Sequence, residues 1–419
     1  MDIKMSFWNY QPFCSYGDGK KHETSLLDDM PLRQAVHEWK ELGFNYPMSF
    51  VYYGEEPETC GRKKIEKGQR KADVTEMLDL CRLHGMKVIL NDKRVNMSTL
   101  TAKGEEEFRK GVKRSVKDFG SHPAVYAYYI GDEPGNEESL AAAETASRIV
   151  KEYAPRLETY LNHLPVALDP AIQPSESFML AGGYERYVDN AKTKILGYDN
   201  YAALAVYDKE KYLDDWFANL KILGDAARRK SVELFVCPNC TGFDCIRTPS
   251  EDDVRWLISA HVASGATGLV WFKLYQDTYY AGTWEGAPYD NKFNKTPTYD
   301  ILRRQIPRFM ENQGAVLKNY DFVWSKHKYK CYGGFEEFTG DDGLTDITCE
   351  INEVPLIVTK LKHKDGYSGY AIVNNSQTER TYVKAVFINA KGEPKTIKRW
   401  LLPGQMALQL FENGEPWLF

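Results

Sequence analysis

The sequence predicts an α/β protein whose larger part is a (β/α)8 barrel, followed by a small all-β sandwich. Strand-like apolar runs alternate with amphipathic helical segments over about the first 320 residues, and this alternation is typical of a parallel sheet. Eight such units close naturally into a barrel. From residue 329 onward, short alternating runs are separated by turn residues, which is typical of antiparallel strands. We therefore place the barrel at 1–320 and the sandwich at 321–419.

The predicted barrel strands are short runs rich in aromatic and aliphatic residues. They lie at 5–10, 44–53, 87–92, 125–131, 158–163, 195–201, 233–239 and 267–275. Pro47 lies inside the second run and weakens that strand, because proline cannot donate to a ladder.

Each predicted strand is followed by a segment with apolar residues at helical spacing. These segments are 31–42, 73–84, 103–120, 136–153, 184–191, 209–230, 250–264 and 296–314. In the first of them, Leu32, Val36, Trp39 and Leu42 share one stripe, and Gly43 ends the helix. A doubly wound open sheet is the alternative, but no Gly-rich phosphate turn follows the first strand.

The predicted sandwich contains runs at 356–361, 367–373 and 382–388, separated by Lys-Asp-Gly, Asn-Asn-Ser and Lys-Gly turns. Cys331 and Cys349 flank a strand-like stretch of this part and could pair.

Charge and hydropathy exclude two classes of partner. The chain has 54 basic and 59 acidic residues, a formal charge of −5, with no basic block, so we expect no nucleic-acid partner. No apolar run approaches the ~20 residues that a membrane-spanning helix needs. Residues 1–6 show no signal-peptide core, so we expect a periplasmic or secreted location only if a leader has been removed, and a cytoplasmic one otherwise.

The fourth predicted strand ends in two adjacent carboxylates, Asp132 and Glu133, followed by Pro134 and Gly135. Carboxylates are costly to bury unless they are paired or face a cleft, so a pair at the mouth of an apolar strand predicts a site. The alternative interpretation is that Asp132 caps the helix that starts near Asn136, while Glu133 is solvated.

Active sites of (β/α)8 barrels lie at the carboxyl ends of the strands. The residues at these ends combine carboxylates, amides and aromatic rings. Besides Asp132 and Glu133, they are Trp8, Asn9 and Tyr10, Asn91 and Asp92, Asn162 and His163, Asp199 and Tyr201, Asn239, and Trp271, Lys273 and Tyr275. Amides and acids bind hydroxyl groups and flat rings cover the apolar face of a sugar, so these residues predict a carbohydrate ligand.

Glu133 is the predicted general acid for glycosidic cleavage, assisted by Asp132. We expect desolvation by the apolar strand and the charge of Asp132 to raise the pKa of Glu133. Adjacent strand residues face opposite ways, so both carboxylates reach one cleft only if the strand ends there, as Pro134 and Gly135 suggest. Asp199 is the next candidate for ligand contact; its alternative role is to bond loop amides.

Other chemistries have weaker support in the sequence. The eight His residues form no His-x-His or His-Glu-x-x-His motif. Cys237 and Cys240 form a lone Cys-x-x-Cys with Cys245 nearby, and a zinc site would need a fourth ligand. The chain contains no Gly-x-Ser-x-Gly sequence, which disfavours serine hydrolysis. We expect neither a metal nor a cofactor.

The Gly131-Asp132-Glu133-Pro134 sequence resembles the Asn-Glu-Pro signature of the retaining (β/α)8 glycoside hydrolases of clan A. The resemblance implies that Glu133 is the acid/base and that Asp132 replaces the Asn that binds the sugar 2-hydroxyl. Clan A also places a nucleophilic Glu at the end of strand seven. Residues 235–240 at this place contain no carboxylate, so the chain departs from the two-carboxylate retaining pattern.

Adjacent Asp and Glu after strand four are also similar to the pair of substrate-assisted N-acetylhexosaminidases. That resemblance implies that Asp132 orients a 2-acetamido group while Glu133 protonates the leaving oxygen, with Tyr201 or Asn239 steadying the acetamide. An inverting hydrolase with Asp199 or Asp92 as base is a further alternative. A carbohydrate-binding protein on a non-catalytic hydrolase barrel is the alternative to an enzyme.

Overall fold

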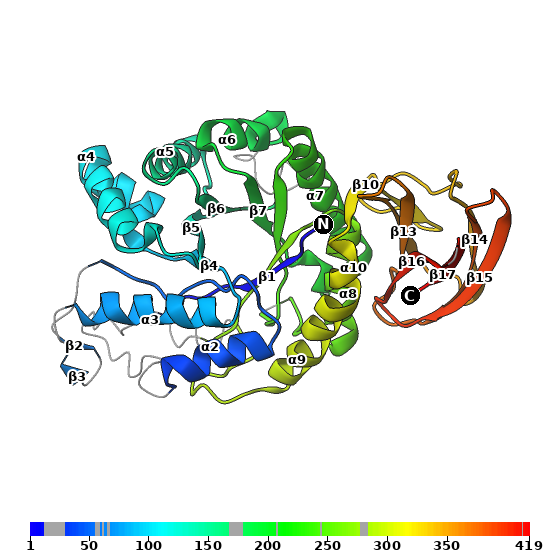
Figure 1. Ribbon diagram of the computed structural model, residues 1–419, viewed down its shortest axis with the longest axis horizontal. Coiled ribbons are helices and arrows are strands. Elements are labelled where there is room, and N and C mark those ends of the chain that lie inside the picture. The colour runs from blue at the N-terminus through cyan, green and yellow to red at the C-terminus, as the bar shows by residue number, and fades with distance from the viewer. Residues whose placement is uncertain are drawn as a thin grey trace.

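The structure is a computed structural model that describes residues 1–11, 30–54, 59–60, 63–64, 68–166, 179–206, 208–243, 245–276, 284–412 and 414–419. A curled parallel sheet surrounded by helices forms the N-terminal part, and antiparallel sheets lie beside it (Figure 1). This arrangement confirms the predicted combination of an α/β barrel-like part and an all-β part.

The curled sheet has seven strands in the part of the chain that the structure describes, in the order β1-β9-β8-β7-β6-β5-β4. The strands are β1 (Lys4–Phe7), β4 (Val88–Leu90), β5 (Val125–Asp132), β6 (Glu158–His163), β7 (Ile195–Asp199), β8 (Glu233–Cys237) and β9 (Gly268–Trp271). The first and last strands pair in parallel, with Met5 opposite Leu269, so the sheet curls on itself. Most of these strand residues are buried, as expected for parallel strands covered on both faces.

The predicted second strand at 44–53 is wrong. Within this segment, Met48 and Tyr52 form only isolated parallel bridges, to Ile89 and Asp92. Backbone bonds still tie the segment to both sheet edges, from the Asn45 N–H to the Met5 carbonyl and from the Ser49 N–H to the Ile89 carbonyl. Pro47 cannot donate, which is the physical reason for an interrupted ladder.

The eight predicted helices all have counterparts around the sheet (Figure 1). They are α2 (Leu32–Glu41), α3 (Gln69–Leu83), α4 (Met97–Ser115), α5 (Glu137–Tyr153), α6 (Tyr184–Ala191), α7 (Lys209–Lys230), α8 (Glu251–Ala263) and α9 (Pro297–Phe309). Shorter helical turns are η1 (Lys93–Val95), η2 (Val116–Gly120), η4 (Met179–Gly183), η5 (Ala202–Leu204), η6 (Met310–Gly314) and α10 (Ala315–Leu317). None of the helices in the described ranges has the length and hydropathy needed to cross a membrane.

The helix after the carboxylate pair is capped by Asn136, whose side chain accepts from the Ser139 N–H while Ser139 bonds back to Asn136. The alternative interpretation, in which Asp132 caps this helix, is therefore wrong.

Side chains inside the curl of the sheet form a separate apolar cluster that lies below the strand ends. Its rings include Trp8 and Tyr129, with centroids 5.3 Å apart, and Tyr160 and Phe235, with centroids 5.8 Å apart. These aromatic side chains fill the interior of the sheet and form a rigid floor for whatever lies above them.

The C-terminal part consists of two antiparallel sheets with the orders β10-β12-β13-β16-β17 and β11-β14-β15. The strands are β10 (Tyr320–Lys328), β11 (Leu344–Ile351), β12 (Leu356–His363), β13 (Ser368–Asn374), β14 (Thr381–Ile388), β15 (Pro394–Leu401), β16 (Met406–Glu412) and β17 (Glu415–Leu418). A short hairpin of β2 (Thr59–Cys60) and β3 (Lys63–Lys64) lies in the N-terminal part. Cys331 and Cys349 are free thiols, so the suggested pairing is wrong. The boundary at residue 320 stays a prediction.

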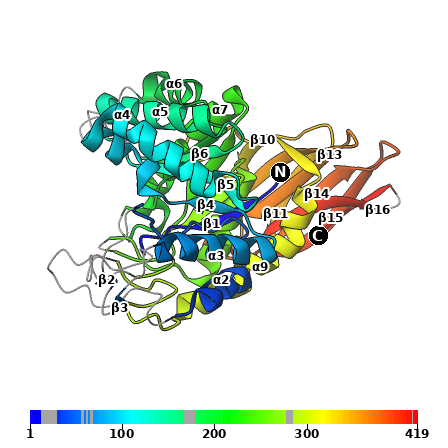
Figure 2. The ribbon, with the colours of Figure 1, turned by 60° about the vertical axis from the view of Figure 1, so that its left-hand side comes forward.

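The two parts are joined by a buried junction in which α8 packs against β12 and β13. Figure 2 shows the antiparallel strands of the C-terminal part beside the helices and strands of the N-terminal part. The Trp256 indole N–H donates to the Asn375 side-chain oxygen at 2.8 Å. The Thr359 hydroxyl donates to the Ala263 carbonyl at 2.6 Å. These interdomain hydrogen bonds accompany a continuous apolar core, so the β part holds the helices that support the sheet.

Candidate active site

A pocket opens at the carboxyl ends of the parallel strands, with an empty volume of about 690 Å³ that includes its open mouth. It brings together eight residues that the sequence predicts for the site. They are Trp8, Tyr10, Asp132, Glu133, Asn162, Asp199, Tyr201 and Lys273. Phe272 and Trp284 complete the lining. This size and mixture of rings and convergent polar groups suit a small ligand or a few sugar units.

Strand register places the polar side chains next to one another. Asp132 at the end of β5 lies opposite Asn162 on β6, and Asp199 at the end of β7 lies opposite Cys237 on β8. Because the strands are parallel, their carboxyl ends meet at one edge of the sheet, which is why residues far apart in sequence line one pocket.

Glu133 has a left-handed backbone conformation, with φ of +45°. Its N–H donates to the Asn162 carbonyl at 2.8 Å, which fixes the point at which the chain leaves the sheet. Since the strand ends at Asp132, the usual alternation of side chains stops there, and both carboxylates line the same pocket.

The Asp132 carboxyl accepts a hydrogen bond from the Asn162 side-chain amide at 3.1 Å. Burial raises the pKa of Asp132 to about 7, and the charge of Glu133 acts in the same direction. The amide of Asn162 and the positive charge of Lys93 oppose this shift without cancelling it. Asp132 therefore titrates near neutral pH.

Asp199 is 6% exposed and accepts a hydrogen bond from the Tyr201 hydroxyl at 3.2 Å. Burial raises the pKa of Asp199 well above its usual range, and the negative charges of Glu133 and Asp132 act in the same direction. Asp199 therefore keeps its proton to a higher pH than a solvated Asp does.

Glu133 is an exposed residue, in contrast to the expectation that the apolar strand would desolvate it. The strand is buried up to Gly131, but the turn at Glu133 carries this side chain out to the pocket mouth. Desolvation acts on Asp132 and Asp199 instead.

Aromatic rings form one wall of the pocket and surround Lys273. The Lys273 ammonium lies 5.8 Å from the ring centre of Tyr10, 5.7 Å from that of Phe272 and 5.9 Å from that of Trp284. Tyr201 packs edge-on against Trp284 at 5.8 Å. This wall supplies both the ring faces and the cation–π contacts that hold a buried lysine in place.

Phe272 and Trp284 are pocket residues that sequence reasoning missed. Phe272 directly follows β9 and could have been found from its place at a strand end, beside the predicted Trp271 and Lys273. Trp284 lies in a loop beyond the last strand, and no periodic pattern in the sequence marks it.

Two residues that the sequence predicts to contact the ligand, Asp92 and His163, have protein partners instead. The Asp92 carboxylate pairs with Arg94 at 2.7 Å and accepts from the Ser115 hydroxyl at 2.6 Å. The ring of His163 packs against Tyr187, its Nδ1 lies 2.8 Å from the Gly197 carbonyl, and burial lowers its pKa to about 4. Neither side chain lines the pocket, so the structure gives no support for their contact with a ligand.

The remaining predicted residues also lie outside the pocket lining. The Asn9 side-chain oxygen accepts from the Gln11 N–H, and the Asn239 amide donates to the Thr241 carbonyl. Tyr275 accepts from the Trp39 indole, while Asn91 and Trp271 are buried. Ligand contact by Asn9, Asn91, Asn239, Trp271 and Tyr275 stays a prediction.

Among the described residues, no cluster of three or more His, Cys, Asp or Glu side chains is arranged to hold a metal ion. Cys237 and Cys240 are buried free thiols, and burial raises the pKa of each. Protonated, enclosed thiols are poor metal ligands and poor nucleophiles.

No family model matches the chain, and no curated protein matches its sequence. Solved structures match the fold. A family 5 glycoside hydrolase from Bacteroides vulgatus is 11% identical with a TM-score of 0.57, covering 97% of this chain and 89% of the other. A structure described as a glycoside hydrolase is 10% identical with a TM-score of 0.55, covering 98% and 89%.

A β-galactosidase from the psychrophilic Marinomonas ef1 is 11% identical with a TM-score of 0.51. That match covers 74% of this chain, which spans 60% of the β-galactosidase. At these identities the likeness concerns the fold, a barrel-like α/β part.

Proposed function

We propose that the protein is a glycoside hydrolase that cleaves O-glycosidic bonds of an oligo- or polysaccharide in the pocket at the strand ends. The observation that carries the proposal is the gathering of Asp132, Glu133 and Asp199 in one aromatic-walled pocket at the strand ends. The fold shared with two structures described as glycoside hydrolases adds support. Aromatic faces beside carboxyl and amide groups are what a sugar ring needs.

In the proposed mechanism, Glu133 is the general acid. It receives a proton from the carboxyl group of Asp199 and donates this proton to the glycosidic oxygen. The bond between that oxygen and the anomeric carbon breaks, and its electron pair stays on the leaving oxygen. Water then attacks the anomeric carbon and releases its proton to a carboxylate of the pocket.

The three carboxyl groups that line the pocket take different tasks in this mechanism. We propose that Asp199 stores the proton and that Asp132 assists, by receiving the water proton or by stabilising positive charge on the sugar ring.

The test is Glu133→Gln assayed on a panel of aryl glycosides that includes N-acetylhexosaminides. We expect turnover to fall by about 10²–10⁴-fold while saccharide binding is retained, because the amide keeps the shape but cannot donate an acidic proton. Glu137→Gln is the matched control, since Glu137 is an exposed glutamate close to Glu133 in the sequence and does not line the pocket. Unchanged turnover in Glu133→Gln would show that the acid is another residue.

A non-catalytic carbohydrate-binding protein is the second candidate function. One observation favours it: β8 ends at the buried thiol Cys237, where clan A has its nucleophilic carboxylate. Saccharide binding by the wild-type protein without turnover of any panel substrate would support this alternative.

A further inference from the structure

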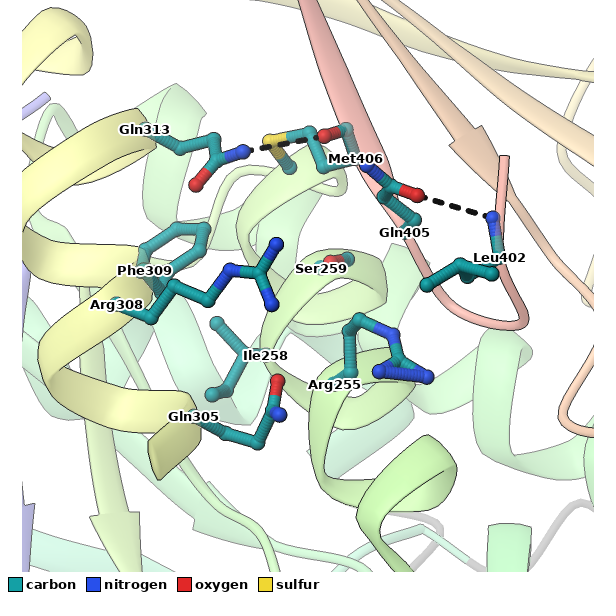
Figure 3. A pocket seen from close by; sticks show the side chains of 10 residues that line it. All are labelled: Arg255, Ile258, Ser259, Gln305, Arg308, Phe309, Gln313, Leu402, Gln405 and Met406. Atoms are coloured by element: carbon teal, nitrogen blue, oxygen red, sulfur yellow. Dashed lines mark hydrogen bonds between the residues drawn. The ribbon is translucent and has the colours of Figure 1, made fainter. Parts of the chain in front are cut away.

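A second hollow lies away from the strand ends, where α8, α9 and the turn before β16 meet (Figure 3). Its empty volume is about 470 Å³, which includes space open to solvent. The apolar side chains of Ile258, Phe309 and Met406 line part of it, and Gln305 and Gln313 add amide groups. A mainly apolar wall with a few convergent polar groups is the usual composition of a small-molecule site.

Two arginines from neighbouring helices extend into this junction hollow (Figure 3). Arg255 belongs to α8 and Arg308 to α9. Burial lowers the pKa of Arg255, and the positive charge of Arg308 acts in the same direction, against the attraction of Glu251. Two guanidinium groups that repel each other in one hollow favour the binding of an anion between them.

The acidic side chains beside the junction hollow already have partners within the protein. Asp252 pairs with Arg255, and Glu251 pairs with Arg304 at 2.8 Å while accepting from the Gln305 amide. Arg255 also donates to the Pro403 carbonyl at 2.8 Å. The guanidinium of Arg308 has no hydrogen bond or ion pair with any residue that the structure describes. A positive charge in excess of the local acids therefore faces the hollow.

We propose that the junction hollow binds a small organic carboxylate, with its charged head between Arg255 and Arg308 and its apolar body against Phe309 and Met406. Guanidinium groups match carboxylates geometrically and bind them by paired, charge-assisted hydrogen bonds. Met406 begins β16 and the arginines belong to the helices, so the ligand bridges the α/β part and the β part. A ligand bound only when the two parts are docked stabilises the folded chain.

Thermal denaturation of the full chain with benzoate tests the proposal. Benzyl alcohol is the uncharged analogue, and sodium chloride matches the ionic strength. We expect a saturable rise in Tm with benzoate that neither control produces. Arg308→Gln removes a charge without breaking a structural contact, and we expect it to weaken benzoate binding about tenfold or more, as the loss of a charged hydrogen bond does.

Arg303→Gln is the matched control, because it removes an exposed arginine of the same helix that does not line the hollow. It is expected to bind benzoate as the wild type does. No rise in Tm with benzoate, a rise equal to that with sodium chloride or benzyl alcohol, or equal affinities in the two variants would overturn the proposal.

Discussion

At the residue scale, the pocket is defined by carboxyl groups that hold protons at unusually high pH. Asp132 and Asp199 owe their raised pKa values first to burial and then to neighbouring negative charge. Such perturbed groups, gathered in a cleft, are typical of sites that transfer protons. The same groups make the folded state less stable as they ionise, which links the site to stability.

Asp132→Asn is predicted to stabilise the protein at high pH. The pKa of Asp132 is about 7 when folded, against about 3.9 for an unfolded Asp, so the folded state binds more protons between these values. Stability from this group is complete below pH ~3.9 and is lost as the pH rises through ~7. Urea unfolding should show the variant about 1–3 kcal/mol more stable at pH 8 and equal to wild type near pH 4. A difference that does not change with pH would contradict the assignment.

Trp284→Ala is predicted to weaken saccharide binding more than it slows the chemical step. The ring packs at a tilt against Phe272, with centroids 4.6 Å apart, and lines the pocket among aromatic side chains rather than among the carboxyls. Losing an aromatic ring contact usually costs about 1–2 kcal/mol. We therefore expect KM to rise about tenfold, with kcat changed less. Steady-state kinetics on the substrate found in the aryl glycoside panel measure both. A fall in kcat with constant KM would assign Trp284 another role.

At the element scale, the close packing of β6 against β7 sets the positions of the site residues at the ends of these strands. Gly197 on β7 lies two residues before Asp199, and a Cβ at this position would lie 2.8 Å from the Leu161 carbonyl and 2.5 Å from the Tyr160 ring. Neither neighbour can withdraw without disturbing β6, which carries Asn162. The spacing of β6 and β7 therefore depends on Gly197 having no side chain.

Gly197→Ala is predicted to destabilise the protein by about 1–3 kcal/mol, the usual cost of overpacking a buried site. Gly135→Ala is the control, since a Cβ there meets nothing within 4 Å. Urea denaturation of the two variants should separate them clearly. Equal stabilities would mean that the strands can move apart without cost.

The sequence predicted the elements well where the pattern was local. The apolar run of β5, ended by Asp132, was visible because a strand and its terminating residues are contiguous. The segment around Pro47 was predicted as a full strand because its apolar residues fit one. Its backbone forms only isolated bridges, to Ile89 and Asp92. Contacts across several strands could not be predicted, which is why the place of Trp284 in the pocket wall and the burial of His163 came only from the structure.

At the scale of the whole molecule, the α/β part and the β part share one buried junction. The apolar core of the sheet and helices continues into side chains of β12, β13 and β16. Domains joined by a large apolar interface tend to unfold together rather than move independently. Loss of the junction is therefore expected to affect the pocket as well.

Trp256→Phe is predicted to lower the stability of the entire chain. The change leaves the buried Asn375 oxygen without its donor, which costs about 1–3 kcal/mol. Trp400→Phe, at a tryptophan that is 44% exposed on β15, is the control and should change stability by less than about 0.5 kcal/mol. Calorimetry should show one transition shifted to lower temperature. Two separate transitions would indicate that the parts unfold independently.

The most direct test of the account is a leaving-group comparison in Glu133→Gln. If Glu133 protonates the glycosidic oxygen, substrates with poor leaving groups need it and activated dinitrophenyl glycosides do not. We predict a loss of about 10²–10⁴-fold on methoxyphenyl glycosides and a loss several-fold at most on dinitrophenyl glycosides of the same sugar. Equal losses on both substrates would contradict the claim that Glu133 is the acid.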